Sequence, residues 1–310
     1  MTIDSVECGG GQPCPGMPTV TDHEGNVYGT VQIGSQCWMK ENMRCRTSPS
    51  SGNEMVFSEL IYSQVNKSAT YPDKDERNVG TYGILYNWCA AMDVFYAEIG
   101  CPEIANSNTM RQYMDSVYEV TVNEYHRGIC PSGWHIPSDA DWAQLAMYVY
   151  NNDCYRCGDC NYPLNYRTTT TCIGKALAST MGWEIFDENT YESENFWGYG
   201  GTTCYVGYNP STNNATGFSA MPAGYVELYM YHDTTNISTG LIDTNWVYTS
   251  HAHNFGEMAR FWSSTNNDDD NTGNSFSLQY DDSSAIRRSR PLGRAQSVRC
   301  LRNAAFLPDE

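Results

Sequence analysis

Alternating apolar and polar residues predict a β-hairpin near the start of the chain. Apolar residues alternate over residues 27–33, Gly34-Ser35 follows, and a second apolar segment covers residues 36–39. A two-residue Gly-X loop suits a type II′ turn between antiparallel strands. Further short strands, each with one buried face, are expected in five later segments, at residues 82–86, 217–225, 260–263, 275–280 and 296–301.

The strongest helical pattern begins after Ser138. Ser138 is expected to be the N-cap, and Asp141, three residues later, completes a capping box. Apolar residues then recur at helical spacing and predict one buried face, at Trp142, Leu145, Ala146 and Val149. Residues 87–91 and 173–178 are expected to form two shorter helices.

The intervening segments are polar and are interrupted by Gly and Pro, without an internal repeat or a clear linker. We therefore expect one elaborated α+β domain with few helices, long loops and a strongly connected antiparallel sheet. It would cover residues 23–303, after a Gly/Pro-rich lead-in at 1–22 and before a tail at 304–310. Insertions are expected near 46–79, which should be a long surface excursion, 93–127 and 150–170.

Composition restricts the classes of partner. The chain has 36 acidic and 18 basic residues and a net charge of −18, which argues against binding nucleic-acid phosphates or an anionic membrane face. No run of about 20 apolar residues is present, so no membrane insertion is expected. The first residues lack the basic and apolar regions of a signal peptide.

The 13 cysteines favour an exported protein, because cytosolic thiols stay reduced and are rarely so numerous outside metal sites. We expect that a leader has been removed; the alternative is a cytosolic protein with many free thiols. The odd number leaves at least one thiol unpaired or paired between chains. A local bridge between Cys8 and Cys14 stays open at this point.

The spacing Cys154-x-x-Cys157-x-x-Cys160, with Cys172 beyond, superficially resembles a zinc knuckle. Zinc sites usually contain a second pair of ligands at some distance, and none follows here. A disulfide-stapled insertion is therefore the favoured interpretation.

Other candidate chemistry is weaker. Residues 268–273 place oxygen ligands at alternate positions, but Gln279 stands where an EF-hand needs Glu, so a solvated loop is favoured. His251 and His253 could present two imidazoles on one strand face, although spacing identifies no third ligand. His135 is expected to be a packed structural residue. Because no catalytic or nucleotide-binding motif is present either, we expect no enzyme, no cofactor and no metal.

A series of motifs, in this order, resembles the Fibrobacter succinogenes major paralogous domain family. The matching segments are 25–28, 33–39, 41–42, 82–83, 85–88, 130–142, 174–177, 216–220, 222–224, 261–265 and 297–300. The resemblance covers about residues 20–303. It implies a C-type-lectin-like fold, secreted or surface proteins of gut Bacteroidetes and their relatives, and no established catalytic activity. The three insertions and the extra cysteines depart from the family pattern.

The implied fold returns the last strand to the first layers, so the resemblance leads us to expect a disulfide between Cys130 and Cys300. The segments with strong local patterns predict a buried aromatic core, made of Trp38, Trp88, Trp134, Trp142, Phe218 and Trp262.

Members of this fold class also serve as variable proteins of diversity-generating retroelements, in which mutation at adenines alters a ligand-binding face near the C-terminus. Asn codons treated in this way cannot become Lys, Glu, Gln, Met or Trp. Residues 263–295 contain none of these types except Gln279. The alternative is an ordinary loop rich in Asn, Asp and Ser.

The leading hypothesis is a non-enzymatic adhesin or receptor-binding protein, extracellular or on the cell surface, that binds a protein or glycan on another surface. Its ligand-binding residues would be Asn266, Asn267, Asp268, Asp269, Asp270, Asn271, Tyr280, Asp281, Asp282, Ser283, Ser284, Arg287, Arg288, Arg290 and Arg294. Mostly exposed side chains on one face are expected at Asn266, Asp268, Asp270, Tyr280, Asp282, Arg287 and Arg290.

The clustered Arg287, Arg288 and Arg290 could meet an acidic group on the partner; the alternative is that they only balance Asp281 and Asp282. One alternative is a structural module of a cell-surface or pilus-like assembly, and another is a phage tail receptor-binding protein. A glycan-processing enzyme is less favoured, since it would need a pair of carboxylates in a cleft. The oligomeric state stays open.

Overall fold

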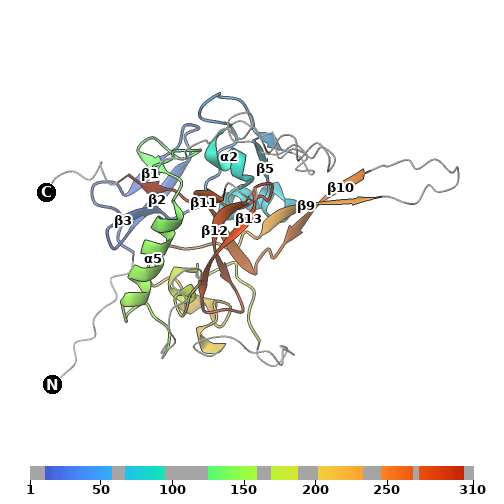
Figure 1. The fold of residues 1–310 in the computed structure, drawn as a ribbon. Coiled ribbons are helices and arrows are strands. Elements are labelled where there is room, and N and C mark those ends of the chain that lie inside the picture. Colours follow the sequence, from blue (N-terminus) through green and yellow to red (C-terminus); the bar gives the residue numbers. More distant parts are fainter. Residues whose placement is uncertain are drawn as a thin grey trace, which may run out of the picture.

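Four groups of paired strands organise the part of the chain that the structure describes, and most of the pairs are antiparallel. The computed structural model describes residues 11–57, 67–94, 125–158, 169–187, 202–232, 246–267 and 272–303 (Figure 1). Helices are few, and α5 (Asp139–Asn151) is the longest among these residues. The expected α+β class with antiparallel strands is therefore confirmed.

The two ends of the described chain meet in one five-stranded sheet, in the order β1-β2-β3-β14-β7. Strand β14 pairs with β3 through Leu301 and Trp38, and with β7 on its other side. The bounds of these strands are β1 (Thr19–Thr21), β2 (Val27–Ile33), β3 (Gln36–Met39), β7 (Trp134–His135) and β14 (Leu301–Arg302).

The predicted hairpin is confirmed in β2 and β3. Ile33 pairs with Gln36 across the turn, and Gly34 has a φ of 60° while Ser35 keeps a negative φ, as a type II′ turn requires. The segment before the hairpin is more than a lead-in, because β1 pairs with β2. A local bridge from Cys8 is also wrong: Cys14 is bonded to Cys37 on β3.

Helix α5 lies against a second sheet, in the order β11-β12-β13-β8 (Figure 1). Its strands are β11 (Met258–Asn267), β12 (Thr272–Gln279), β13 (Ala285–Pro291) and β8 (Thr169–Thr170). The capping box is confirmed: the Asp141 amide donates to Ser138 Oγ at 3.2 Å, and the Ser138 amide donates to Asp141 Oδ2 at 2.8 Å. The helix buries its predicted face, and the Trp142 ring stacks on Phe276 with centroids 4.6 Å apart.

The opposite face of β11 packs on a second apolar cluster. Trp262 lies in this cluster with Trp88, which belongs to α2 (Trp88–Met92) directly after β6 (Leu85–Tyr86). The Trp88 indole donates to the Ser263 carbonyl at 3.0 Å, and the Trp262 indole donates to the Tyr86 carbonyl at 2.8 Å. All six predicted core aromatics are buried, none more than 2% exposed, so the aromatic core is confirmed.

The predicted surface excursion at 46–79 is wrong in part. Met55 and Ala69 join the core, and Lys67 forms a buried ion pair with Asp93, Nζ to Oδ1, at 2.6 Å. The reason is long-range pairing, since β5 is paired with β6 as well as with β4. The elements in this region are β4 (Val56–Phe57), β5 (Ser68–Thr70), η1 (Pro72–Lys74), η2 (Glu76–Asn78) and α1 (Val79–Tyr82).

Three predicted strands are shorter than expected. The strand expected at 82–86 contains only β6, because α1 extends to Tyr82 and Gly83 ends that helix with a φ of 78°. Residues 217–224 form an irregular loop in which Gly217 and Gly224 have φ values of 76° and 66°, and β9 (Tyr225–His232) begins only after it. Residues 296–300 make single bridges to Tyr86 and Phe261 instead of a continuous ladder. Strand β9 pairs with β10 (Trp246–His253) in a ribbon that projects from the rest of the molecule (Figure 1).

The remaining described elements are the predicted short helix and two 3-10 turns. The helix is confirmed as α6 (Gly174–Leu177), and 3-10 turns occur at η4 (Thr202–Cys204) and η5 (Pro210–Thr212). Most of the predicted insertions at 93–127 and 150–170 fall outside the described residues.

A buried arginine in the last segment contacts two earlier motifs, at residues 41–42 and 216–220. Arg299 is fully buried and donates to the Asn42 side chain at 2.6 Å and to the Phe218 carbonyl. Its guanidinium lies over the Phe218 ring at 4.6 Å. Burial lowers the pKa of Arg299 to about 9, so the group remains a cation at neutral pH.

Disulfides cross-link distant segments of the fold. The predicted Cys130–Cys300 bond is confirmed, with Cα atoms 5.9 Å apart, and Cys157 is bonded to Cys204. Cys89, Cys154 and Cys172 are also disulfide-bonded, which supports the stapled interpretation of the cysteine-rich segment. Several disulfides fit an extracellular protein. Within the described ranges, no helix has the length and apolar character needed to cross a membrane.

Candidate ligand-binding site

The two faces of the β11-β12-β13 sheet divide the predicted ligand-binding residues. Phe276 pairs with Arg287 and Ser275 pairs with Arg288. Because paired residues point to the same face of an antiparallel sheet, Arg287 shares the α5 side with Phe276, and Arg288 lies on the opposite side. Arg290, two residues along β13, shares the face of Arg288. The expectation of one common face for these arginines is therefore wrong.

Arg287 contributes to packing under the start of α5. Its side chain is only 11% exposed and forms an ion pair with Asp139 in the first helical turn. Burial raises the pKa of Asp139 even though the neighbouring Arg287 lowers it. This arginine is not a freely exposed contact residue, because the helix covers it.

The predicted surface at Tyr280–Ser284 is largely a docked turn. Ser283 and Ser284 are buried, and the Asp282 side chain accepts a hydrogen bond from the Ser284 amide at 2.9 Å. Burial raises the pKa of Asp282. The backbone of this turn accepts hydrogen bonds from Gly174, Val206 and Gly207, so neighbouring loops cover most of it. Tyr280 and Asp282 are half-buried, contrary to the expectation of mostly exposed side chains.

At the other end of the hairpin, Asn266 is also half-buried. The side chain of Asn267 and residues 268–271, including Asp268, Asp269, Asp270 and Asn271, lie outside the described residues. The predicted ligand contacts there, and the favoured interpretation of residues 268–273 as a solvated loop, stay predictions.

Four arginines gather on and beside the face of the sheet away from α5, and we call them, with Tyr225, the arginine face. Arg288 is exposed and Arg290 is half-buried on β13, Arg260 lies on β11, and Arg294 follows β13. The guanidinium carbons of Arg260 and Arg294 lie 4.1 Å and 5.5 Å from the centre of the Tyr225 ring. The ring thus forms the floor of a basic cluster at the start of β9.

The cluster contains more positive than negative charge. Arg294 pairs with Glu227, its Nε 2.9 Å from Oε1. Arg260 is only 4% exposed, and its Nε and Nη1 have no hydrogen-bond partner among the described residues. The Nε of Arg290 likewise has no hydrogen-bond partner among the described residues. Burial, and then the charges of Arg290 and Arg294, lower the pKa of Arg260 to about 10.

Sequence reasoning missed Arg260, Tyr225 and Glu227 as parts of a site. Arg260 directly precedes the apolar pair Phe261-Trp262, and a charged residue at that position of a buried strand was the available signal. No local pattern connects Tyr225 with residues 260 and 294, since the contact depends on the ribbon β9-β10 reaching the second sheet.

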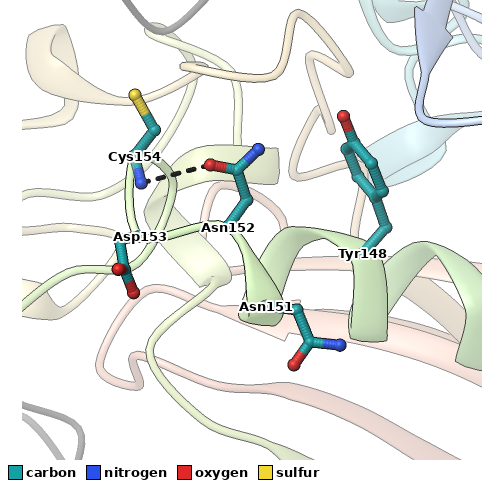
Figure 2. Close-up of a pocket in the computed structure, with 5 residues that line it drawn as sticks. All are labelled: Tyr148, Asn151, Asn152, Asp153 and Cys154. Carbon is teal, nitrogen blue, oxygen red and sulfur yellow. Dashed lines mark hydrogen bonds between the residues drawn. The ribbon is translucent and has the colours of Figure 1, made fainter. Parts of the chain in front are cut away.

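A separate cavity of about 520 Å³ lies at the C-terminal end of α5. Figure 2 shows Tyr148 and Asn151 on the helix, followed by Asn152, Asp153 and Cys154. The Cys154 amide donates to the Asn152 side chain at 3.4 Å. These five lining residues offer amides, a phenol and one carboxylate, which could hydrogen-bond a neutral polar molecule.

A smaller cavity of about 240 Å³ is lined by Tyr125, His135, Asp141 and neighbouring polar residues. His135 is buried, as predicted, with Nδ1 2.7 Å from the Asn303 side-chain oxygen and Nε2 3.6 Å from Asp141 Oδ2. Burial raises the pKa of Asp141, but the side chains of His135 and Ser138 outweigh it and the pKa lies below its usual value. The contact between His135 on β7 and Asp141 on α5 thus holds these two elements together.

His251 and His253 were considered above as a pair of imidazole ligands, an interpretation that the sequence did not favour. The His251 and His253 rings are 6.4 Å apart on β10, and the described ranges contain no group of three or more His, Cys, Asp or Glu side chains that could hold a metal ion. The arginine face combines the unpaired buried donors of Arg260 and Arg290 with an excess of positive charge.

Comparison with known proteins supports one assignment. A family model described as the Fibrobacter succinogenes major domain matches residues 31–302. No curated protein and no solved structure matches the chain.

Proposed function

The chain belongs to the Fibrobacter succinogenes major domain family, and from this premise we propose that it is a non-enzymatic, extracellular or cell-surface protein that binds a ligand through the arginine face. The ligand is a protein or glycan on another cell or surface. The proposal keeps the predicted function but moves its site, from one exposed loop surface to the side of the second sheet that faces away from α5.

One observation carries the proposal. In a chain with a net charge of −18, Arg260 and Arg294 lie over one aromatic ring, Arg288 and Arg290 share the same face of the sheet, and Glu227 is a carboxylate that pairs with Arg294. Holding like charges together costs free energy unless an opposite charge arrives. Such clusters are typical of sites that recognise an anionic group.

We also propose that the fold is C-type-lectin-like. The pairing of β14 with β3 and the Cys130–Cys300 bond support it, since that fold joins its first and last strands. In such a fold, the segments between the paired ends are free to vary in length and to carry a ligand site.

If residues 263–295 are diversified, burial limits which positions can change. Phe276, Leu278 and Ser283 are buried within this segment, so variation there would disturb the core. Arg288 and Ser289 are exposed and tolerate change. We propose that any diversification is restricted to such exposed positions, which a near-copy of the coding segment beside a reverse transcriptase gene would reveal.

A binding screen tests the proposed function. The purified chain would be probed against panels of neutral, carboxylated and sulfated glycans and of extracellular proteins. Arg288→Ala with Arg290→Ala should weaken binding at least tenfold without lowering the thermal midpoint. Arg156→Ala is the control, because Arg156 also lies near a ring, Tyr150, and pairs with the carboxylate of Asp153.

Unchanged binding by the double variant would show that the arginine face is not the ligand surface. A glycan found cleaved after incubation would contradict the non-enzymatic proposal. Binding only to a second copy of the chain would favour a structural module of a surface assembly instead.

A further inference from the structure

We propose that Arg260, Arg290 and Arg294, on the Tyr225 ring, form a site for a tetrahedral oxyanion, a sulfate or phosphate group carried by the ligand. This inference rests on the proposed function and specifies the chemistry that the arginine face recognises.

The unpaired donors come first. Arg260 is 4% exposed, yet its Nε and Nη1 have no hydrogen-bond partner among the described residues. Its Nη2 lies 2.9 Å from the Met258 sulfur, and the Tyr225 side chain is a further polar contact of the guanidinium. Sulfur is a weak acceptor. Buried donors in folded proteins are nearly always satisfied by protein, water or ligand. The Arg260 guanidinium therefore has N–H groups available for a strong acceptor, and Arg290 adds a further unpaired Nε.

The aromatic floor brings these groups to one place. The guanidinium carbons of Arg260 and Arg294 lie 4.1 Å and 5.5 Å from the Tyr225 ring centre, and the His253 ring stacks on Tyr225 with centroids 5.1 Å apart. After burial, the charges of Arg290 and Arg294 lower the pKa of Arg260, and those of Arg294 and Arg288 lower the pKa of Arg290. Stacking offsets part of the cost of burial and leaves the planar N–H edges available.

The number of donors favours a tetrahedral anion over a carboxylate. Each guanidinium presents several N–H groups in a rigid fork that matches two oxygens. The free donors of Arg260 and Arg290, with the remaining N–H groups of Arg294, suit a group with three or four acceptor oxygens. Arg294 already directs its Nε and Nη2 to a single carboxylate oxygen, Glu227 Oε1.

Access comes from the solvent side of the sheet. Arg288 is exposed beside half-buried Arg290 on β13, and neither forms an ion pair with a described carboxylate. These two side chains attract the anion first, and Arg260 then supplies the buried end of the site. Tyr225, itself half-buried, offers a flat surface to the group that carries the anion.

Calorimetry and thermal unfolding of the full chain test the inference with inorganic sulfate and phosphate, at constant ionic strength, against chloride and acetate. Sulfate and phosphate should raise the thermal midpoint in a saturable way, whereas chloride and acetate should not. Arg290→Gln should weaken sulfate binding at least tenfold and, without anion, leave the midpoint equal or higher because a repulsion is removed. Arg156→Gln should leave sulfate binding unchanged.

A second variant guards against a folding artefact. Arg260→Met keeps much of the buried volume and removes the unpaired cation, so it should fold and lose the response to sulfate. Equal stabilisation of the parent chain and Arg290→Gln, or no binding of either oxyanion, would overturn the inference. Galactose 6-sulfate, galactose 6-phosphate and galactose then distinguish the two sources of the group, since the first two should compete with inorganic sulfate to different degrees and galactose should not.

The outcomes separate this inference from the proposed function. If neither oxyanion binds but ligand binding still depends on Arg288 and Arg290, the oxyanion site is wrong and the ligand-binding proposal stands. If oxyanions bind but no protein or glycan does, the site is supported and the proposed function fails.

Discussion

Removing the Cys130–Cys300 disulfide should destabilise the protein more than removing Cys14–Cys37. The two bonds close loops with sequence separations of 170 and 23 residues, and all four cysteines are at most 3% exposed. Alanine pairs at either site therefore lose similar packing. The difference between them should report mainly on the entropy of the unfolded chain.

The expected losses follow from loop length. In the chain-entropy model the long loop is worth about 5.2 kcal/mol and the short loop about 3.4 kcal/mol, a difference of about 1.8 kcal/mol. The Cys157–Cys204 bond lies within the long loop and bypasses 47 of its residues. That shortcut lowers the first value by only about 0.3 kcal/mol, because the dependence is logarithmic.

Urea unfolding at pH 7 without reductant measures both losses, with Cys130→Ala/Cys300→Ala compared to Cys14→Ala/Cys37→Ala. The slope of free energy against urea should rise in each variant as the unfolded chain expands. Equal losses, or a larger loss for the short loop, would refute the entropic reasoning. They would show instead that local packing around each bond determines its contribution.

Three further outcomes are expected. Arg299→Ala should lower the free energy of unfolding by about 3 to 5 kcal/mol, since it leaves a cavity and unpaired acceptors such as the Asn42 side chain; a loss below about 1 kcal/mol in urea unfolding would contradict this. Asp141→Ala should cost about 1 kcal/mol at pH 7 through the lost capping box with Ser138. The pKa of Asp141 in the folded protein is lowered from 3.8, so its stabilisation is present above pH 3.8 and is lost as the pH falls through the folded pKa. The free energies of unfolding of the parent chain and of Asp141→Ala should therefore converge in acid. A difference between them that stays constant with pH would contradict this reasoning. Cys45 is a buried free thiol whose pKa burial raises, so iodoacetamide should label it only after unfolding, and rapid native labelling would show that the site opens.

Local patterns were sufficient where the determinants of structure are near neighbours in sequence. The turn at Gly34 and the capping box at Ser138 each depend on a few consecutive residues, and both form as predicted. The helical spacing of Trp142 likewise identified the buried face of α5 correctly. Such elements are decided by backbone geometry and by the match between periodicity and burial.

The candidate site was predicted only in part, because the face of the sheet on which a side chain lies depends on how the strands are paired. Residues 287 to 290 were expected on one surface as a basic group, but alternation along β13 sends Arg287 under α5 and Arg288 and Arg290 to the other side. The alternation itself is visible in the sequence, whereas the side that α5 covers is not. Ser283 was misplaced for a related reason, since loops distant in sequence bury it.

By itself, the sequence determined the type of the main elements, the aromatic core and, through its family resemblance, the pairing of Cys130 with Cys300. Tertiary structure alone decided that Cys14 bonds to Cys37 and that Arg260 meets Tyr225. Short-range geometry repeats wherever the same residues occur, so pattern suffices for it. Contacts between residues distant in sequence depend on how whole sheets pack, and the charge cluster that we propose as the binding site arises only from that packing.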